Sequence, residues 1–111
     1  MRLPDVDEVM RSQSRLEEEA ENFGRRLRDK ERQVREVLAT VLRSEDLAMV
    51  KPRVRYQAAR HSELRDLAEF VSRFVDRARE RSGEEFERAR EALLNFLEAT
   101  VAYARYYGVR R

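Results

Sequence analysis

The sequence contains few residues that interrupt regular structure and none that could form a disulfide. Its 111 residues include no cysteine, no tryptophan, two prolines and three glycines. Because turns are built largely from glycine and proline, a chain so poor in both has few turns and long elements between them. An all-β sandwich or barrel, which needs a turn roughly every ten residues, is therefore disfavoured. The absence of cysteine excludes a disulfide framework and a thiolate metal site.

Features that many enzymes and metalloproteins require are also missing. His61 is the only histidine, and Ala58 stands three positions before it, so the Glu-x-x-His pairs of a di-iron bundle are absent. The three isolated glycines form neither a phosphate-binding loop nor a Gly-x-Ser-x-Gly elbow. We therefore expect a protein that is not an enzyme and uses no metal, no cofactor and no small-molecule substrate. An unrecognised enzyme would instead need perturbed acidic residues in a deep pocket.

Long apolar runs are absent as well. No window approaches the roughly 18 apolar residues that cross a membrane as a helix. The first residues, Met1 to Asp7, are acidic and lack the apolar stretch of a signal peptide. The sequence therefore predicts a cytoplasmic protein that has no contact with a membrane.

Apolar residues recur at the three- and four-residue spacing of amphipathic helices almost throughout the chain. The stripes cover residues 6–23, 25–43, 52–59, 64–78 and 84–107. A turn signal, Arg81-Ser82-Gly83, joins the last two, which should then pack antiparallel. We expect an all-α protein, a single compact bundle of about four or five helices whose last two are long and antiparallel. It forms one domain over residues 1–111, with an acidic helical segment at 1–24 and the bundle core at 25–111.

Four small or rigid residues are expected to mark helix boundaries. Gly24 should break or bend the first helix, and Pro52 should lie in the first turn of a short one. Ser62 precedes an acidic residue and has the character of an N-cap. Gly108 follows a long stripe, and we expect it to adopt the left-handed conformation that closes many helices.

Charge is abundant, and it is sorted along the chain. Basic residues number 24 against 22 acidic ones, and only Lys30 and Lys51 are lysine. Residues 1–24 contain three basic and seven acidic side chains, residues 25–65 twelve and six, and residues 66–98 six and nine. The small net charge of +2 therefore conceals a basic middle between acidic flanks.

The strongest basic feature lies between Asp46 and Glu63, where no acidic residue interrupts the run. On a helix that starts near Pro52, Arg53 and Arg60 lie seven residues apart and share one face. Arginine binds phosphate oxygens through two parallel hydrogen bonds, and a helix start adds a positive dipole. The candidate nucleic-acid-binding residues are Lys51, Arg53, Arg55 and Arg60, with Arg35 and Arg43 added from the charge count alone.

The same run also has a structural interpretation. In a chain with 41% charged residues, a basic stretch is usually a solvated helix face whose arginines form ion pairs. Asp46, Glu63 and Asp66 are close enough in sequence to be the partners. The residues alone therefore leave nucleic-acid binding and ion pairing both open.

The aromatic residues divide into two groups. Four phenylalanines fall on the apolar stripes and indicate core positions: Phe70, Phe74, Phe86 and Phe96. Tyrosine is stable half-buried with its hydroxyl in water, which suits an interface. We therefore expect packing or subunit contact for the four tyrosines, Tyr56, Tyr103, Tyr106 and Tyr107.

Two segments together carry a family resemblance. The first is Val50-Lys51-Pro52-Arg53-Val54-Arg55-Tyr56-Gln57-Ala58-Ala59-Arg60, followed by Glu63-Leu64, and the second is the stretch from Phe96 to Gly108, with its Tyr106-Tyr107-Gly108 ending. In order and spacing they resemble the small subunit of the type III-A CRISPR effector, the Csm complex. The likeness covers roughly residues 47–108, and no match is apparent in residues 1–30.

This resemblance implies a fold, a function and partners. The family's small subunit is all-helical and has no catalytic activity. Several copies stack head-to-tail beside the repeated backbone subunit and line the groove that holds the crRNA–target RNA duplex. Contacts to phosphates and sugars would suffice, because guide pairing reads the sequence. The expected partners are crRNA, target RNA, the backbone and large subunits, and copies of itself.

The resemblance places RNA contact at four residues of the first segment: Lys51, Arg53, Arg55 and Arg60. A purely structural helical adaptor or homodimerisation module remains the alternative. In that case the tyrosines and helix stripes would form the contact surface, and reversal of the arginine charges would leave RNA binding unchanged.

Overall fold

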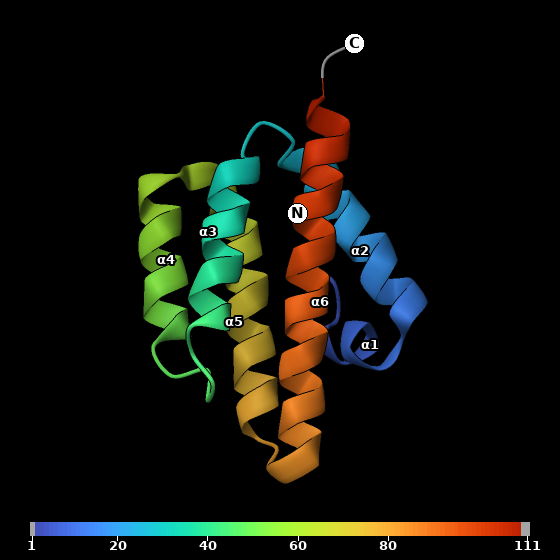
Figure 1. The fold of residues 1–111 in the computed structure, drawn as a ribbon, viewed down its shortest axis with the longest axis vertical. Helices are drawn as coiled ribbons and strands as arrows, with labels where there is room; N and C mark the ends of the chain where they lie inside the picture. Colours follow the sequence, from blue (N-terminus) through green and yellow to red (C-terminus); the bar gives the residue numbers. More distant parts are fainter. Residues whose placement is uncertain (1, 110–111) are drawn as a thin grey trace.

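A computed structural model describes residues 2–109, which form a bundle of helices (Figure 1). These residues contain six α-helices and one 3-10 turn and no strand. The elements are α1 (Val6–Arg11), α2 (Gln13–Arg26), α3 (Glu31–Leu42), α4 (Val50–Arg60), η1 (Ser62–Leu64), α5 (Arg65–Arg79) and α6 (Gly83–Gly108). The all-α class is confirmed. The expected four or five helices are too few, because the first predicted stripe is divided into α1 and α2.

Helix α6 runs along the molecule and packs against α2, α3 and α5 (Figure 1). Helix α4 lies on the outer side of the bundle, where it packs against α5 and α3. Helices α5 and α6 are antiparallel, because the short turn over residues 80–82 joins them. Helices α3 and α4 are likewise antiparallel and are joined by residues 43–49, so one surface of the molecule is formed by these two helices.

Phenylalanine rings from three helices form the centre of the core. Phe23 of α2, Phe70 of α5 and Phe96 of α6 are buried, with ring centroids 5.0–5.8 Å apart. Phe74 extends the cluster, 5.9 Å from Phe70. Phe86, in contrast to the expectation, is only partly buried at the edge of the core. Burial of such large apolar surfaces is the main favourable contribution to the stability of the fold.

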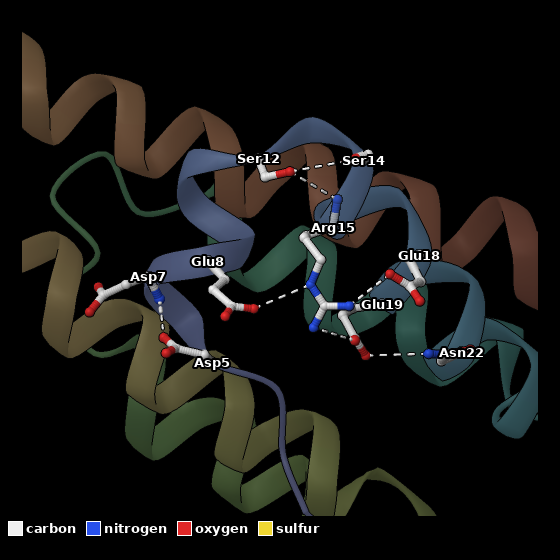
Figure 2. Close-up of polar contacts among 9 residues, drawn as sticks. All are labelled: Asp5, Asp7, Glu8, Ser12, Ser14, Arg15, Glu18, Glu19 and Asn22. Carbon is white, nitrogen blue, oxygen red and sulfur yellow. Dashed lines mark hydrogen bonds and ion pairs between the residues drawn. The ribbon is translucent and has the colours of Figure 1, made fainter.

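A single residue, Ser12, separates α1 from α2 (Figure 2). Its backbone is extended, with φ −124° and ψ 117°, and its hydroxyl accepts a hydrogen bond of 3.2 Å from the Arg15 N–H. The Arg15 guanidinium then contacts Glu8 of α1 at 3.3 Å and Glu18 and Glu19 of α2 at 2.7 and 3.1 Å. This cluster holds α1 folded back against the bundle.

Two glycines occupy positions where another segment approaches closely. Gly24 does not break its helix, and Gly108 does not adopt the expected left-handed conformation. Gly24 lies inside α2, where a Cβ atom would come within 2.5 Å of the Tyr103 Cβ and 2.9 Å of the Ala104 nitrogen on α6. Gly108 is the last residue of α6 and is not left-handed. A Cβ atom there would lie 2.6 Å from the carbonyl oxygen of Arg28. Both glycines thus serve close packing between segments rather than chain reversal.

The connection from α4 to α5 contains a second departure from expectation. Ser62 starts the 3-10 turn and does not cap α5, whose N-cap is Leu64. The 3-10 turn brings the Leu64 side chain into the core directly before α5 begins, and this side chain is buried. Pro52 lies in the first turn of α4, as its missing N–H predicts.

Candidate nucleic-acid interface

The loop between α3 and α4 fixes the start of the basic run. Leu47 and Met49 are left-handed, with φ of 64° and 66°, and the Leu47 side chain is fully buried. Arg90 of α6 donates hydrogen bonds of 3.1–3.3 Å to three carbonyl oxygens beside this loop. They belong to Val41, Leu42 and Ser44. The last carbonyls of a helix lack intrahelical partners, so this guanidinium caps α3 and holds the loop.

Two of the predicted cations on α4 face α5. The Lys51 Nζ lies 2.7 Å from the Asp76 carboxylate, and the Arg55 guanidinium lies 3.6 Å from the Glu69 carboxylate. Pairs this exposed contribute little to stability. They do reduce the positive potential on this side of α4, because each cation has a carboxylate beside it.

The other side of α4 faces α3 and carries Arg53, Tyr56 and Arg60. Together with Arg43, just after the end of α3, these residues line a groove of about 330 Å³ between the two helices, here called the α3–α4 groove. The spacing of three and seven residues on α4 places its three side chains on one helix face. Glu36 is the single carboxylate among the lining residues.

The groove is cationic because arginines predominate among the charged residues that line it. Within residues 2–109, none of Arg43, Arg53 and Arg60 forms an ion pair. The Arg60 guanidinium instead lies 5.9 Å from the centre of the Tyr56 ring. Three guanidinium groups that have no ion-pair partner among the described residues surround one hollow, where Glu36 is the carboxylate in the lining. Such an arrangement favours an anion such as a phosphate.

A short chain of hydrogen bonds joins the two helices beneath the groove. The Gln57 Nε2 donates to the Thr40 Oγ1 at 3.1 Å, and the Thr40 hydroxyl donates to the Glu36 carbonyl oxygen at 2.9 Å. Thr40 is buried. These contacts attach α4 to α3, so the backbone positions from which Arg43, Arg53 and Arg60 extend are fixed relative to each other.

Of the six predicted RNA-binding residues, the structure brings Arg43, Arg53 and Arg60 together. Arg35 lies elsewhere, because it pairs with Glu31, which is also 3.6 Å from Arg105 of α6. Neither Tyr56 nor Glu36 was assigned to the groove from the sequence. Helical spacing could have predicted both positions. Tyr56 shares a helix face with Arg53 and Arg60, and Glu36 of α3 lies seven residues before Arg43.

The four tyrosines occupy different environments. Tyr103 packs partly against the core beside Gly24. Tyr107 is half-buried; its hydroxyl donates to Glu21 and accepts a 3.0 Å hydrogen bond from Arg25, which raises the pKa of that guanidinium. The remaining two face solvent, Tyr56 with 64% and Tyr106 with 59% of its surface exposed.

Residues 2–109 present neither a metal-ligand cluster nor a membrane-spanning helix. No three histidine, cysteine or acidic side chains there are grouped as metal ligands would be. None of the helices in the same range has the length and apolar character needed to cross a membrane.

The fold and the groove define a class: an all-helical bundle that presents an arginine-lined hollow between two antiparallel helices. Comparison with known protein families narrows this class. The chain belongs to the Csm2 type III-A family, whose family model matches residues 10–110. The resemblance seen in the sequence is thus confirmed, and the match extends to residues 10–30, where none was apparent. Comparisons with curated proteins and with solved structures gave no match.

Family membership assigns the chain to an assembly. It is a small subunit of the type III-A CRISPR effector, and it functions within the Csm complex with the other subunits. Csm2 is a structural small-subunit family. The first four of the six residues of α1 lie before the matched residues, whereas the whole of the α3–α4 groove lies within them.

Proposed function

We propose that this subunit is non-catalytic and holds the sugar–phosphate backbone of the crRNA–target RNA in the α3–α4 groove. Several copies would stack along the complex in the cytoplasm and present their grooves to the same RNA. The observation that carries the proposal is the set of three arginines, Arg43, Arg53 and Arg60, which line one groove without carboxylate partners within residues 2–109.

Charge and geometry support phosphate as the ligand of this groove. A guanidinium offers a planar fork of N–H donors that matches two phosphate oxygens. A phosphate can approach Arg53 and Arg60 without first displacing a carboxylate, whereas at Lys51 and Arg55 it would compete with Asp76 and Glu69. We therefore rank Arg43, Arg53 and Arg60 as the primary contacts, with Lys51, Arg55 and Arg35 as secondary ones.

The test is neutralisation of the groove in the reconstituted complex. Arg53→Gln combined with Arg60→Gln should weaken target RNA binding equally for all target sequences, because phosphates carry no sequence information. If each arginine neutralises one phosphate, the slope of log affinity against log salt should become shallower by roughly 1.4 for each copy of the subunit that contacts the RNA. Filter binding or fluorescence anisotropy at several salt concentrations measures both effects.

A matched control separates the groove from net charge. Arg11→Gln combined with Arg88→Gln removes the same charge from exposed residues of α1 and α6 that also form no ion pair within residues 2–109. The control should keep the affinity and the salt slope of the unmodified complex. Equal losses in both double variants would mean that the groove has no special role, and unchanged RNA affinity in the groove variant would refute the proposal.

A structural adaptor remains a second candidate because of Tyr106. This ring is 59% exposed near the C-terminal end of α6, where it lies edge-on to Tyr107 at 5.0 Å. If the tyrosines mediate association, Tyr106→Ala should shift the molar mass measured by light scattering. A subunit that acts only as an adaptor should bind no RNA when isolated, whereas a subunit that holds RNA in the groove should bind it weakly when isolated, because stacked copies supply avidity in the complex.

A further inference from the structure

Tyr56 is the most exposed of the large apolar and aromatic side chains within residues 2–109. It lies on α4 between Arg53 and Arg60 and lines the α3–α4 groove together with both. The Arg60 guanidinium covers part of its ring at 5.9 Å, and 64% of the residue still faces solvent. An aromatic ring left in water within a cationic groove has no evident function in folding.

We propose that Tyr56 is a stacking platform for one unpaired RNA base, with the phosphates on either side held by the groove arginines. This inference rests on the proposed function, because it places the same RNA in the same groove, at a nucleotide that is not base-paired. A positively charged groove with an aromatic side chain is the arrangement by which proteins bind single strands without reading their sequence. The base must be unpaired, since a base inside a duplex is already stacked on both faces.

The size of the groove is suited to a single base. Its volume of about 330 Å³ is at the lower end of the range that encloses a small organic molecule. A stacked base would share the ring with Arg60, which can contact aromatic and base faces through its planar guanidinium. Arg53 and Arg43 remain available for the phosphates.

Electrostatics favours RNA over a second protein as the partner of Tyr56. A protein surface that buried this ring would also remove water from Arg43, Arg53 and Arg60. Burial of a charge without a partner is costly, so such a protein would have to supply several carboxylates at matching positions. An RNA strand supplies a base and two phosphates in one continuous segment.

The absence of tryptophan from the chain provides a direct probe. In the full chain, Tyr56→Trp introduces a single indole whose fluorescence reports on the groove. Its emission should be quenched when a single-stranded oligouridine binds, and it should respond much less to a strand of the same length and charge that lacks bases. Tyr106→Trp places the same reporter at the exposed end of α6 and should not respond to either strand.

Affinity measurements test the energetic contribution of the ring. Stacking on an aromatic side chain changes affinity by roughly 5- to 150-fold per base. Tyr56→Leu should therefore weaken binding of oligouridine by a factor in this range and leave binding of the abasic strand unchanged. Tyr56→Phe, which keeps the ring, should retain most of the affinity. Because the side chain is exposed, these variants should unfold at the same urea concentration as the unmodified protein.

The outcomes distinguish the stacking role from the proposed function. If Arg53→Gln combined with Arg60→Gln weakens binding of both strands and Tyr56→Leu weakens neither, the groove binds phosphates and the stacking proposal is wrong. If none of these variants changes binding, both proposals fail. If the indole emission of the Tyr56→Trp variant shifts with protein concentration in the absence of RNA, Tyr56 is a contact between copies, which also overturns the stacking role.

Discussion

The substitution Gly24→Ala tests how closely α2 and α6 pack. Sequence reasoning alone predicts that alanine stabilises a helix interior by about 1 kcal/mol relative to glycine. The structure predicts the opposite sign. An alanine Cβ would lie 2.5 Å from the Tyr103 Cβ, 2.9 Å from the Ala104 nitrogen and 3.0 Å from the Tyr103 carbonyl carbon.

The magnitude follows from the displacement that alanine requires. Ordinary van der Waals contact begins near 3.4 Å, so α2 and α6 must move apart by almost 1 Å, and most of the clashing atoms belong to a helix backbone that cannot rotate away. A gap of this size removes a quarter to a half of the dispersion energy of each affected contact. Overpacking typically costs about 1–3 kcal/mol, and contacts of 2.5–3.0 Å with atoms that cannot rotate away place this site in the upper half of that range. After the helix-propensity gain of about 1 kcal/mol, a net loss of about 1–2 kcal/mol remains.

The assay is urea denaturation followed by circular dichroism, with a thermal scan on the same samples. A loss of this size should lower Tm by roughly 4–12 °C. Gly83→Ala is the control, because no atom lies within 4 Å of its added Cβ and its cost comes only from a left-handed φ of 58°. An unchanged or raised free energy of unfolding for Gly24→Ala would show that α2 and α6 do not pack as closely as described.

Two further predictions concern the loop between α3 and α4. Arg90→Ala removes the donor to three carbonyls and should cost about 1–2 kcal/mol in urea denaturation, whereas Arg88→Ala, two positions away, should cost little. The Ala48 N–H donates to the Asp46 carboxylate at 3.0 Å and lowers the pKa of Asp46 below its usual 3.8. A lowered pKa in the folded state gives stability that is complete above the unfolded-state pKa and is lost as pH falls through the folded one. Asp46→Ala should therefore lose stability relative to the unmodified protein at pH 6, and the difference should shrink towards pH 2.5; a difference independent of pH would refute the assignment.

Local sequence was sufficient to predict which segments are helical and where several of them meet. Helical spacing follows from the local repeat of apolar side chains, so the stripes became helices α2 to α6. The short turn before Gly83 makes α5 and α6 antiparallel. Pro52 lies in the first turn of α4, where a backbone N–H has no intrahelical acceptor and its absence costs nothing. The family could be assigned from two short motifs, since both lie within the matched residues.

What the arginines and glycines face, in contrast, depends on how the helices pack. Arg55 and Arg60 look alike in the sequence, but Arg55 has Glu69 of α5 beside it and Arg60 lines a groove without an ion-pair partner within residues 2–109. From the sequence, Gly24 is interpreted as a helix breaker. In the structure, a Cβ atom at this position would lie 2.5 Å from the Tyr103 Cβ of α6. In each case the neighbour lies more than ten residues away in sequence, and local spacing fixes only the side of the helix on which a residue lies. What lies opposite that side is set by the packing of the bundle.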